Sequence, residues 1–238
     1  MAGAYDEIAD WYDESVRAQG SLASRVAEHV VALTGEITGQ EVCDLACGQG
    51  LVARHLARRG ARVTGLDLST KLLGMARREE TAAPLGIIYR WDDAQSLTSL
   101  ENECFDGVTC SLALMDIPEL AATFGAIHRV LRPGGWLVFS ITHPCFQIPP
   151  SSSAASDGKS PAEGSYFDER FWRSDYPHGV RGQVGAHHRT LSTYLNAMSG
   201  AGFILERLLE PGGAGETSRR SPVDPAVPKF LIVRCRKG

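Results

Sequence analysis

The chain has 238 residues, of which 43% are hydrophobic and 22% are charged, so it can bury a core without help from disulfides or metals. Its 24 Lys and Arg residues against 28 Asp and Glu residues give a net charge of -4, which disfavours a nucleic acid as the main partner. We expect a cytoplasmic protein without membrane attachment, because no apolar stretch has the length of a span and the N-terminus does not resemble a signal peptide.

The cysteine and histidine patterns predict no required metal. The six cysteines form no CxxC pair and have no paired spacing with histidine. In a reducing compartment most of them are expected to be small buried residues. Histidines and carboxylates form no metal-ligand pattern either.

Hydrophobic periodicity predicts two helices within residues 3–35, followed by alternating strands and helices. Strands are expected at 41–46, 62–67, 87–91, 105–111, 136–142, 203–209 and 229–236. Helices are expected at 51–59, 70–80, 118–131 and 191–200. This alternation implies parallel strands with right-handed crossovers. We therefore expect an α/β fold, Rossmann-like and doubly wound, with a mostly parallel seven-stranded sheet and helices on both faces.

The pattern changes after the fifth expected strand. Residues 149–165 are rich in Pro, Ser, Ala and Gly, which is typical of a flexible loop. An aromatic cluster follows, and then a short possible hairpin around 180–184. A second loop rich in Gly and Pro is expected at 211–228. One domain with an insertion of about 45 residues accounts for this pattern.

A glycine turn joins the first strand to the next helix, in residues 42–50. Glycines let the backbone approach a ligand at the carboxyl end of a strand, where open α/β sheets bind ligands. Asp67, near the end of the next strand, can accept hydrogen bonds from both hydroxyls of a ribose. Asp44 would repel a pyrophosphate, and Ala46 and Ala53 replace two glycines of a dinucleotide fingerprint. The pattern favours an adenosine ligand with a cationic middle.

The segment Asp44–Gly50 resembles the first motif of class I S-adenosylmethionine methyltransferases, commonly Asp/Glu-x-Gly-x-Gly-x-Gly, with Ala46 in place of the first glycine. Asp67 resembles the ribose-binding acid of that family, and Asp93-Ala94 resembles the pair that contacts adenine. Leu131–Gly135 resembles the turn before strand five. The N-terminal pattern of Tyr5, Asp6, Ala9, Tyr12 and Asp13 resembles a helix that covers the cofactor in small-molecule members.

The resemblance covers about residues 5–142 and 188–236, and it implies S-adenosylmethionine as the cofactor. The cofactor-binding residues that it implies are Tyr12, Asp44, Ala46, Cys47, Gly48, Gly50, Asp67, Leu68, Asp93, Ala94, Ser111 and Leu112. On this basis we expect the chain to divide into four parts. They are an N-terminal helical cap (1–35), a cofactor-binding core (36–142), a lid and substrate insertion (143–188) and a C-terminal completion of the core (189–238).

The insertion and the end of strand four should face the methyl acceptor in this architecture. Candidate substrate-binding residues are Met115, Tyr166, Phe167, Trp172 and Tyr176. Aromatic residues beside such a loop are typical of a lid over an apolar pocket, and a small hydrophobic satellite core is the alternative. Asp116 is expected to cap the helix that begins near Pro118.

Three histidines are candidate catalytic residues, namely His187, His188 and His143. An imidazole with a near-neutral pKa suits removal of a proton from a hydroxyl or an amine. The alternative is that proximity alone suffices for catalysis and that the histidines only anchor the lid.

The sequence thus predicts a methyltransferase acting on O, N or C of a small-molecule acceptor. An RNA or protein methyltransferase is a second reading, which the acidic balance disfavours. A third is a protein that binds the cofactor without methylating, or a cyclase, which the intact motifs leave open. A homodimer is also left open.

Overall fold

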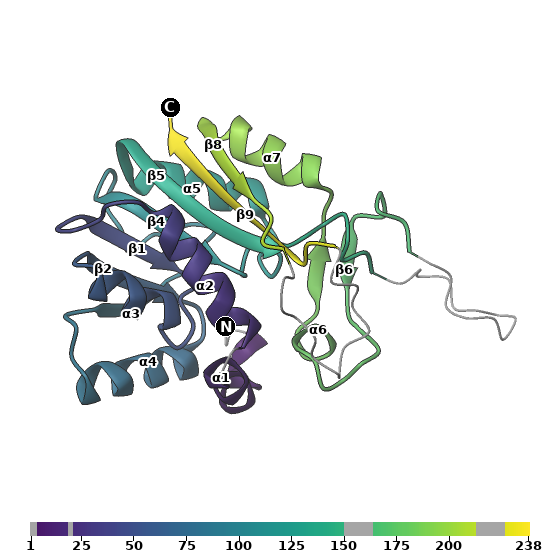
Figure 1. Ribbon diagram of the computed structural model, residues 1–238, viewed down its shortest axis with the longest axis horizontal. Helices are drawn as coiled ribbons and strands as arrows, with labels where there is room; N and C mark the ends of the chain where they lie inside the picture. The colour runs from purple at the N-terminus through teal and green to yellow at the C-terminus, as the bar shows by residue number, and fades with distance from the viewer. Residues whose placement is uncertain (1–3, 19–20, 150–163, 213–226) are drawn as a thin grey trace, which may run out of the picture.

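The order of the strands confirms the fold expected from the sequence (Figure 1). The computed structural model describes residues 4–18, 21–149, 164–212 and 227–238. In it, seven strands form one sheet in the order β3-β2-β1-β4-β5-β9-β8. The strands are β1 (Glu41–Leu45), β2 (Arg62–Asp67), β3 (Ile88–Trp91), β4 (Phe105–Ser111), β5 (Leu131–Thr142), β8 (Phe203–Leu209) and β9 (Phe230–Lys237). The first five pair in parallel, whereas β9 is antiparallel to both β5 and β8.

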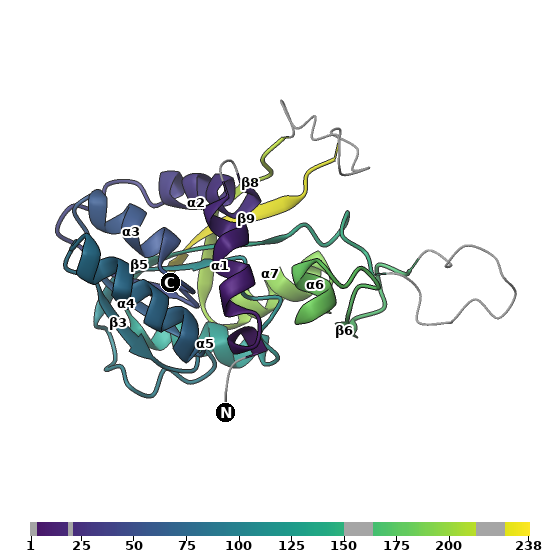
Figure 2. The ribbon, with the colours of Figure 1, turned by 90° about the horizontal axis from the view of Figure 1, so that it is seen from below.

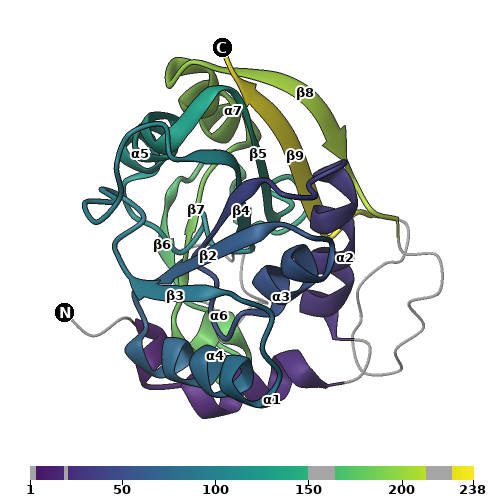
Figure 3. The same cartoon turned by 90° about the vertical axis from the view of Figure 1, so that its left-hand side faces the viewer.

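Helices cover both faces of this sheet (Figure 3). The larger helices are α1 (Ala9–Arg17), α2 (Leu22–Leu33), α3 (Leu51–Arg58), α4 (Thr70–Ala82), α5 (Leu120–Val130) and α7 (Leu191–Gly200). Residues of α2, α3 and α4, such as Val30, Leu56 and Leu73, form one buried cluster with strand residues. Phe124 of α5 and Tyr194 of α7 belong to a second cluster on the other face. The central strands β1, β4 and β5 are thus largely buried on both sides, as expected for parallel strands, whereas the edge strands β3 and β8 are mostly exposed.

Two expected elements differ in the structure. The expected hairpin around 180–184 is wrong, because Val180–Gln183 form the short helix α6, in which Val184 N–H donates to the Val180 carbonyl at 2.9 Å. Apolar residues four apart suit one helical turn as well as a hairpin. Strand β5 begins at Leu131, five residues earlier than expected, because the Pro-Gly-Gly turn lies inside it.

The N-terminal segment packs across the carboxyl edge of the sheet, between α4 and α6 (Figures 1 and 2). It begins with the 3-10 helix η1 (Ala4–Asp6), and Ala9 of α1 packs against Leu72 and Met75 of α4. The buried Asp6 carboxylate accepts hydrogen bonds from the Ser69 hydroxyl at 2.5 Å and from Lys71 N–H at 3.1 Å. The start of α4 therefore holds the N-terminal segment in place.

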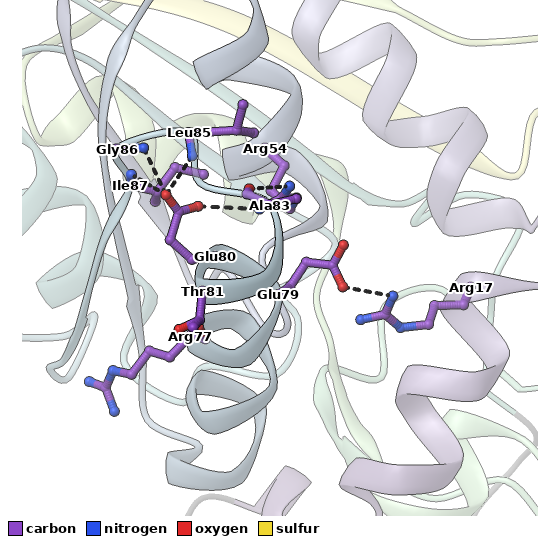
Figure 4. Close-up of polar contacts among 10 residues, drawn as sticks. All are labelled: Arg17, Arg54, Arg77, Glu79, Glu80, Thr81, Ala83, Leu85, Gly86 and Ile87. Atoms are coloured by element: carbon purple, nitrogen blue, oxygen red, sulfur yellow. Dashed lines mark hydrogen bonds and ion pairs between the residues drawn. The ribbon is translucent and has the colours of Figure 1, made fainter.

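The far end of α4 is fixed by one carboxylate (Figure 4). Glu80 Oε1 accepts hydrogen bonds from the backbone N–H groups of Leu85, Gly86 and Ile87, at 2.6, 2.7 and 3.2 Å. Its other oxygen contacts the buried Arg54 of α3 at 3.2 Å. Glu80 thus joins α4, α3 and the loop that leads into β3.

The insertion after β5 is built on a second, two-stranded sheet. Strand β6 (Arg170–Trp172) pairs antiparallel with β7 (Ala186–His188), and Phe171 stands opposite His187. The loops expected at 149–165 and 211–228 lie largely outside the described residues. None of the described helices is both long and apolar enough to cross a membrane. The division of the chain into four parts stays a prediction.

Candidate functional site

A cleft of about 970 Å³, partly open to solvent, lies at the carboxyl ends of β1, β2 and β4. We call it the main cleft. Leu45, Asp67 and Ser111, which end these strands, line it, and so do Tyr5 and Tyr12 of the N-terminal segment.

The glycine turn forms the floor of the main cleft. The turn is closed by Cys47 N–H donating to the Leu66 carbonyl and by Gly50 N–H donating to the Cys47 carbonyl, both at 2.9 Å. Three of its residues have left-handed backbones, with φ of 53° at Ala46, 56° at Gly48 and 89° at Gly50. A left-handed alanine costs roughly 1 kcal/mol relative to glycine. Ala46 therefore takes the backbone that the first glycine of the motif would take.

Gly50 is required by a neighbouring side chain as well as by its own backbone. A Cβ at position 50 would overlap the hydroxyl of Tyr89, which is buried. We expect Gly50→Ala to lower the free energy of unfolding by about 2 kcal/mol or more, from backbone strain and overlap together. Urea denaturation measures this.

Gly125→Ala is the matched control for Gly50→Ala. Gly125 lies on the exposed side of α5, and a Cβ there would meet nothing within 4 Å. That substitution should raise stability by about 0.5–1 kcal/mol, because alanine favours the helix. Equal effects of the two substitutions would contradict the account of the turn.

The Asp67 carboxylate faces the main cleft from the end of β2. Its two oxygens accept hydrogen bonds from Gly48 N–H and Ser69 N–H, each at 2.7 Å. Burial raises the pKa of Asp67, and these backbone bonds oppose that rise. Because each carboxylate oxygen has two lone pairs, further donors can still bind from the cleft. This orientation suits the two hydroxyls of a ribose.

Asp44 lies beneath the glycine turn. Its oxygens accept hydrogen bonds from Ala53 N–H of α3 at 2.9 Å and from the Thr109 hydroxyl of β4 at 2.7 Å. Burial raises the pKa of Asp44 to about 7, with the bonds to Thr109 and Ala53 opposing it. Asp44 lines a smaller pocket, beside the main cleft, which shares Tyr12, Ser111 and Leu112 with it.

Gln49 gives this smaller pocket an unsatisfied donor. Its side-chain Nε2 is buried and has no hydrogen-bond partner among the described residues. Buried amide groups normally have a partner, so an unpaired one that lines a pocket fits a ligand that carries acceptor oxygens. The sequence motif places a residue at this position without specifying its side chain.

The described structure brings most of the expected cofactor residues to the main cleft. Those that line it are Tyr12, Ala46, Gly48, Asp67, Leu68, Asp93, Ala94, Ser111 and Leu112. Asp44 and Cys47 line only the smaller pocket, and Gly50 lines neither. Asp92, which the sequence reasoning missed, also lines the main cleft. The carboxylate oxygens of Asp92 accept hydrogen bonds from Asp93 N–H at 2.8 Å and from Ser99 N–H at 3.0 Å, which holds the backbone of the loop after β3.

The insertion reaches the main cleft with different residues from those expected. Phe171, Val184 and Gly185 line the cleft, whereas none of the five expected substrate residues does. Met115 and Trp172 line a separate pocket. Neighbouring residues of a strand point to opposite faces, which explains why Phe171 reaches the cleft and Trp172 does not.

The other three expected substrate residues are engaged elsewhere or face solvent. The Tyr166 hydroxyl accepts a hydrogen bond from Leu191 N–H at 2.7 Å. Phe167 and Tyr176 are 82% and 65% exposed. Aromatic composition alone could not separate these positions from Phe171.

The three candidate histidines lie outside the main cleft. His143 is buried, with Nε2 2.7 Å from Glu210 Oε1 and Nδ1 accepting from Cys145 N–H at 3.3 Å. His188 Nε2 is 2.9 Å from the Tyr166 carbonyl. His187 lines the separate pocket, and its ring stands 5.1 Å from that of Phe171. Burial, followed by the charge of Arg189, lowers the pKa of His187.

Asp116 lines the main cleft. The expectation that it caps the following helix is wrong. Helix α5 begins two residues beyond Pro118, with Glu119 at its N-cap position. The Asp116 carboxylate instead accepts hydrogen bonds from the Tyr5 hydroxyl, at 2.8 Å, and from Arg181 Nη1. One partner belongs to the N-terminal segment and the other to the insertion. Spacing along the sequence does not reveal that these two segments meet.

The parallel sheet, the glycine turn and the cleft-facing Asp67 carboxylate are features of α/β nucleotide-binding folds. The profile of the methyltransferase domain family matches residues 43–139. A solved S-adenosylmethionine-dependent methyltransferase of Mesorhizobium loti is 34% identical, with 88% of this chain and 96% of that chain covered and a TM-score of 0.72. A second, of Listeria monocytogenes, is 25% identical, with 90% and 99% covered and a TM-score of 0.71. The chain therefore belongs to the S-adenosylmethionine-dependent methyltransferase family.

Curated relatives match the core of the chain. A ubiquinone biosynthesis O-methyltransferase of Alkalilimnicola ehrlichii is 35% identical over 113 residues, which are 48% of this chain and 46% of that protein. The chain thus spans a little under half the length of the curated relatives that it matches. S-adenosylmethionine is the cofactor of the family, and the observed Asp67 carboxylate and unpaired Gln49 amide fit its ribose and its carboxylate.

Proposed function

We propose that the protein transfers a methyl group from S-adenosylmethionine to a small-molecule acceptor. The observation that supports this most is that one cleft is lined both by the carboxylate of Asp67 and by the apolar residues Ile117, Pro118 and Phe171. A cofactor and a small apolar molecule can therefore lie against each other in the same space. The acidic balance of the chain gives no support to a polyanionic acceptor.

We assign the two halves of the cofactor to the two pockets. Asp67 would hold the ribose, and Leu68, Asp93 and Ala94 would lie against the adenine. The methionine half would extend toward the smaller pocket, past Tyr12 and Gln49. When bound, S-adenosylmethionine supplies a methyl group on a sulfonium, which needs no further activation. The main task of the protein is then to align the acceptor and to exclude water.

A hydroxyl-bearing acceptor is the first class to test, because matching relatives are named as O-methyltransferases. The assay incubates the protein with S-adenosylmethionine and a panel of small hydroxylated, aminated and carbon-nucleophile aromatics, and measures S-adenosylhomocysteine. We expect acceptor-dependent turnover with a hydroxylated member. Tight cofactor binding with no turnover across the whole panel would favour the non-methylating alternative. A homodimer and a cytoplasmic location stay predictions of the sequence.

A histidine base is the proposal that the geometry supports least. We expect the maximal rate to stay within about fivefold of wild type when His143, His187 or His188 is replaced by Gln, whereas loss of a true general base costs about 10²–10⁴. The reason is that His143 and His188 are bonded to protein groups and His187 stands behind Phe171. Turnover at saturating acceptor measures this, and a hundredfold loss in any one variant would restore the base hypothesis.

A further inference from the structure

Asp116 stands where three separate parts of the chain meet at the acceptor end of the main cleft. It follows β4, its partner Tyr5 belongs to η1, and its partner Arg181 belongs to α6 of the insertion. Arg181 also donates to the Gly185 carbonyl at 3.0 Å, and Gly185 lines the cleft. Two covering segments therefore hold one carboxylate in a fixed position.

The two bonds leave Asp116 able to accept more. Tyr5 binds Oδ2 and Arg181 binds Oδ1, so each oxygen has one internal donor. A carboxylate has about four acceptor sites, and two are left for groups in the cleft. The side chain of Asp116 is 17% exposed, and it lines the cleft together with Tyr12. Its remaining acceptor capacity is thus available to a molecule bound there.

The charges around the cleft select among such molecules. Asp67, Asp92, Asp93 and Asp116 line it, while no Lys, Arg or His of the described residues does. Arg181 lines the separate pocket rather than the main cleft, and its ion pair with Asp116 offsets part of the charge of that carboxylate. A molecule with a hydroxyl or amine donor meets an acceptor here, and a carboxylate meets repulsion.

We propose that Asp116 determines acceptor specificity. Its carboxylate, positioned by Tyr5 and Arg181, accepts a hydrogen bond from the hydroxyl or amine of the acceptor and disfavours acceptors that carry a carboxylate. This inference rests on the proposed function, because it assigns the acceptor to the main cleft. It places recognition on a residue between the N-terminal segment and the insertion, outside the cofactor motifs.

The test measures binding of three matched probes to protein saturated with S-adenosylhomocysteine, by NMR titration. The probes are 4-methylcatechol, its dimethyl ether, and 3,4-dihydroxybenzoate, so one change removes the donors and the other adds a carboxylate. In the wild type we expect 4-methylcatechol to bind about tenfold more tightly than its ether, as a hydrogen bond to a charged group provides. We also expect 3,4-dihydroxybenzoate to bind more weakly than 4-methylcatechol.

The Asp116→Asn variant should reduce the preference over the ether to within about threefold, since the charged acceptor is lost. It should also improve binding of 3,4-dihydroxybenzoate, which a purely structural role would not do. Glu119→Gln removes one nearby exposed charge and should leave both ratios unchanged. If Asp116→Asn does not fold, Asp116→Ser replaces it, and the preference over the ether should fall in the same way because the carboxylate is lost.

Three outcomes overturn the proposal. The first is wild type that binds S-adenosylhomocysteine but shows no preference among the probes, which leaves the proposed function standing. The second is a preference that survives in a folded variant without the carboxylate, Asp116→Asn or Asp116→Ser, which assigns recognition to another group. The third is wild type that does not bind S-adenosylhomocysteine, which overturns the proposed function itself.

Discussion

Replacing Asp67 by alanine is expected to weaken S-adenosylmethionine binding tenfold or more. The carboxylate lies at the end of β2, faces the main cleft and is oriented by Gly48 N–H and Ser69 N–H. A hydrogen bond to a charged group contributes roughly 1.5–3 kcal/mol, and a ribose offers two hydroxyls to one carboxylate. Calorimetric titration with S-adenosylmethionine measures the loss.

The same bonds make a folding control necessary, because alanine leaves two backbone donors without their acceptor. Asp67→Asn keeps one acceptor oxygen and should fold more stably than Asp67→Ala, yet it should still lose affinity because the charge is gone. Glu101→Ala removes an exposed carboxylate in the loop before β4 and should bind as the wild type does. Unchanged affinity in a folded Asp67→Ala variant would refute the ribose assignment.

The hydrophobic pattern of the sequence was sufficient to predict the strands and helices at the core of the fold. The central strands β1, β4 and β5 contain short apolar runs that are buried in the sheet, and strands alternate with helices along the chain, so local periodicity and topology agree. Ser69 and Thr190, whose residue types favour the N-cap position, stand just before α4 and α7, and each accepts a hydrogen bond from the backbone N–H three residues on. Such caps are local interactions, which is why the sequence reveals them.

The residues that we propose for the acceptor side were harder to predict because they depend on long-range contacts. Tyr5 meets Asp116 across 111 positions of the chain, and Arg181 meets it across 65. The register of β6 against β7 decides that Phe171 rather than Trp172 reaches the cleft, and three-residue strands carry too little pattern to reveal it. Several of the expected cofactor residues, such as Asp67 and Ser111, lie at strand ends, where the topology alone brings them together.

Asp44 is expected to give the proposed cofactor site a pH dependence that the sequence motif alone does not reveal. Burial raises its pKa to about 7 in the folded protein, well above the usual value for Asp. The sign follows from proton linkage, since a folded state that binds the proton more tightly than the unfolded chain gains stability from protonation. This gain is full below about pH 4 and is lost as the pH rises through about 7.

Folding of the cofactor-free protein favours the protonated form of Asp44, whereas cofactor binding should favour the ionised form. S-adenosylmethionine carries a sulfonium and an amino group, and positive charge near the smaller pocket favours the ionised form of Asp44. Binding is therefore expected to release a proton near neutral pH, and affinity should fall by up to about tenfold from pH 8 to pH 6 through this group. Other titrating groups, Asp67 included, add their own slopes, so the comparison must isolate Asp44.

Asp44→Asn provides that comparison, because the amide keeps an oxygen for Ala53 N–H and carries no charge. We expect weaker binding at pH 8 than in the wild type, and a pH profile between 6 and 8 that is flatter by about one proton. Calorimetry in two buffers with different ionisation enthalpies counts the protons released. Urea denaturation of the cofactor-free proteins gives a second measure, since wild type should lose more stability than the variant from pH 5 to pH 8. Identical pH profiles for both proteins, in binding and in unfolding, would show that Asp44 stays ionised beneath the turn and that its burial does not govern cofactor affinity.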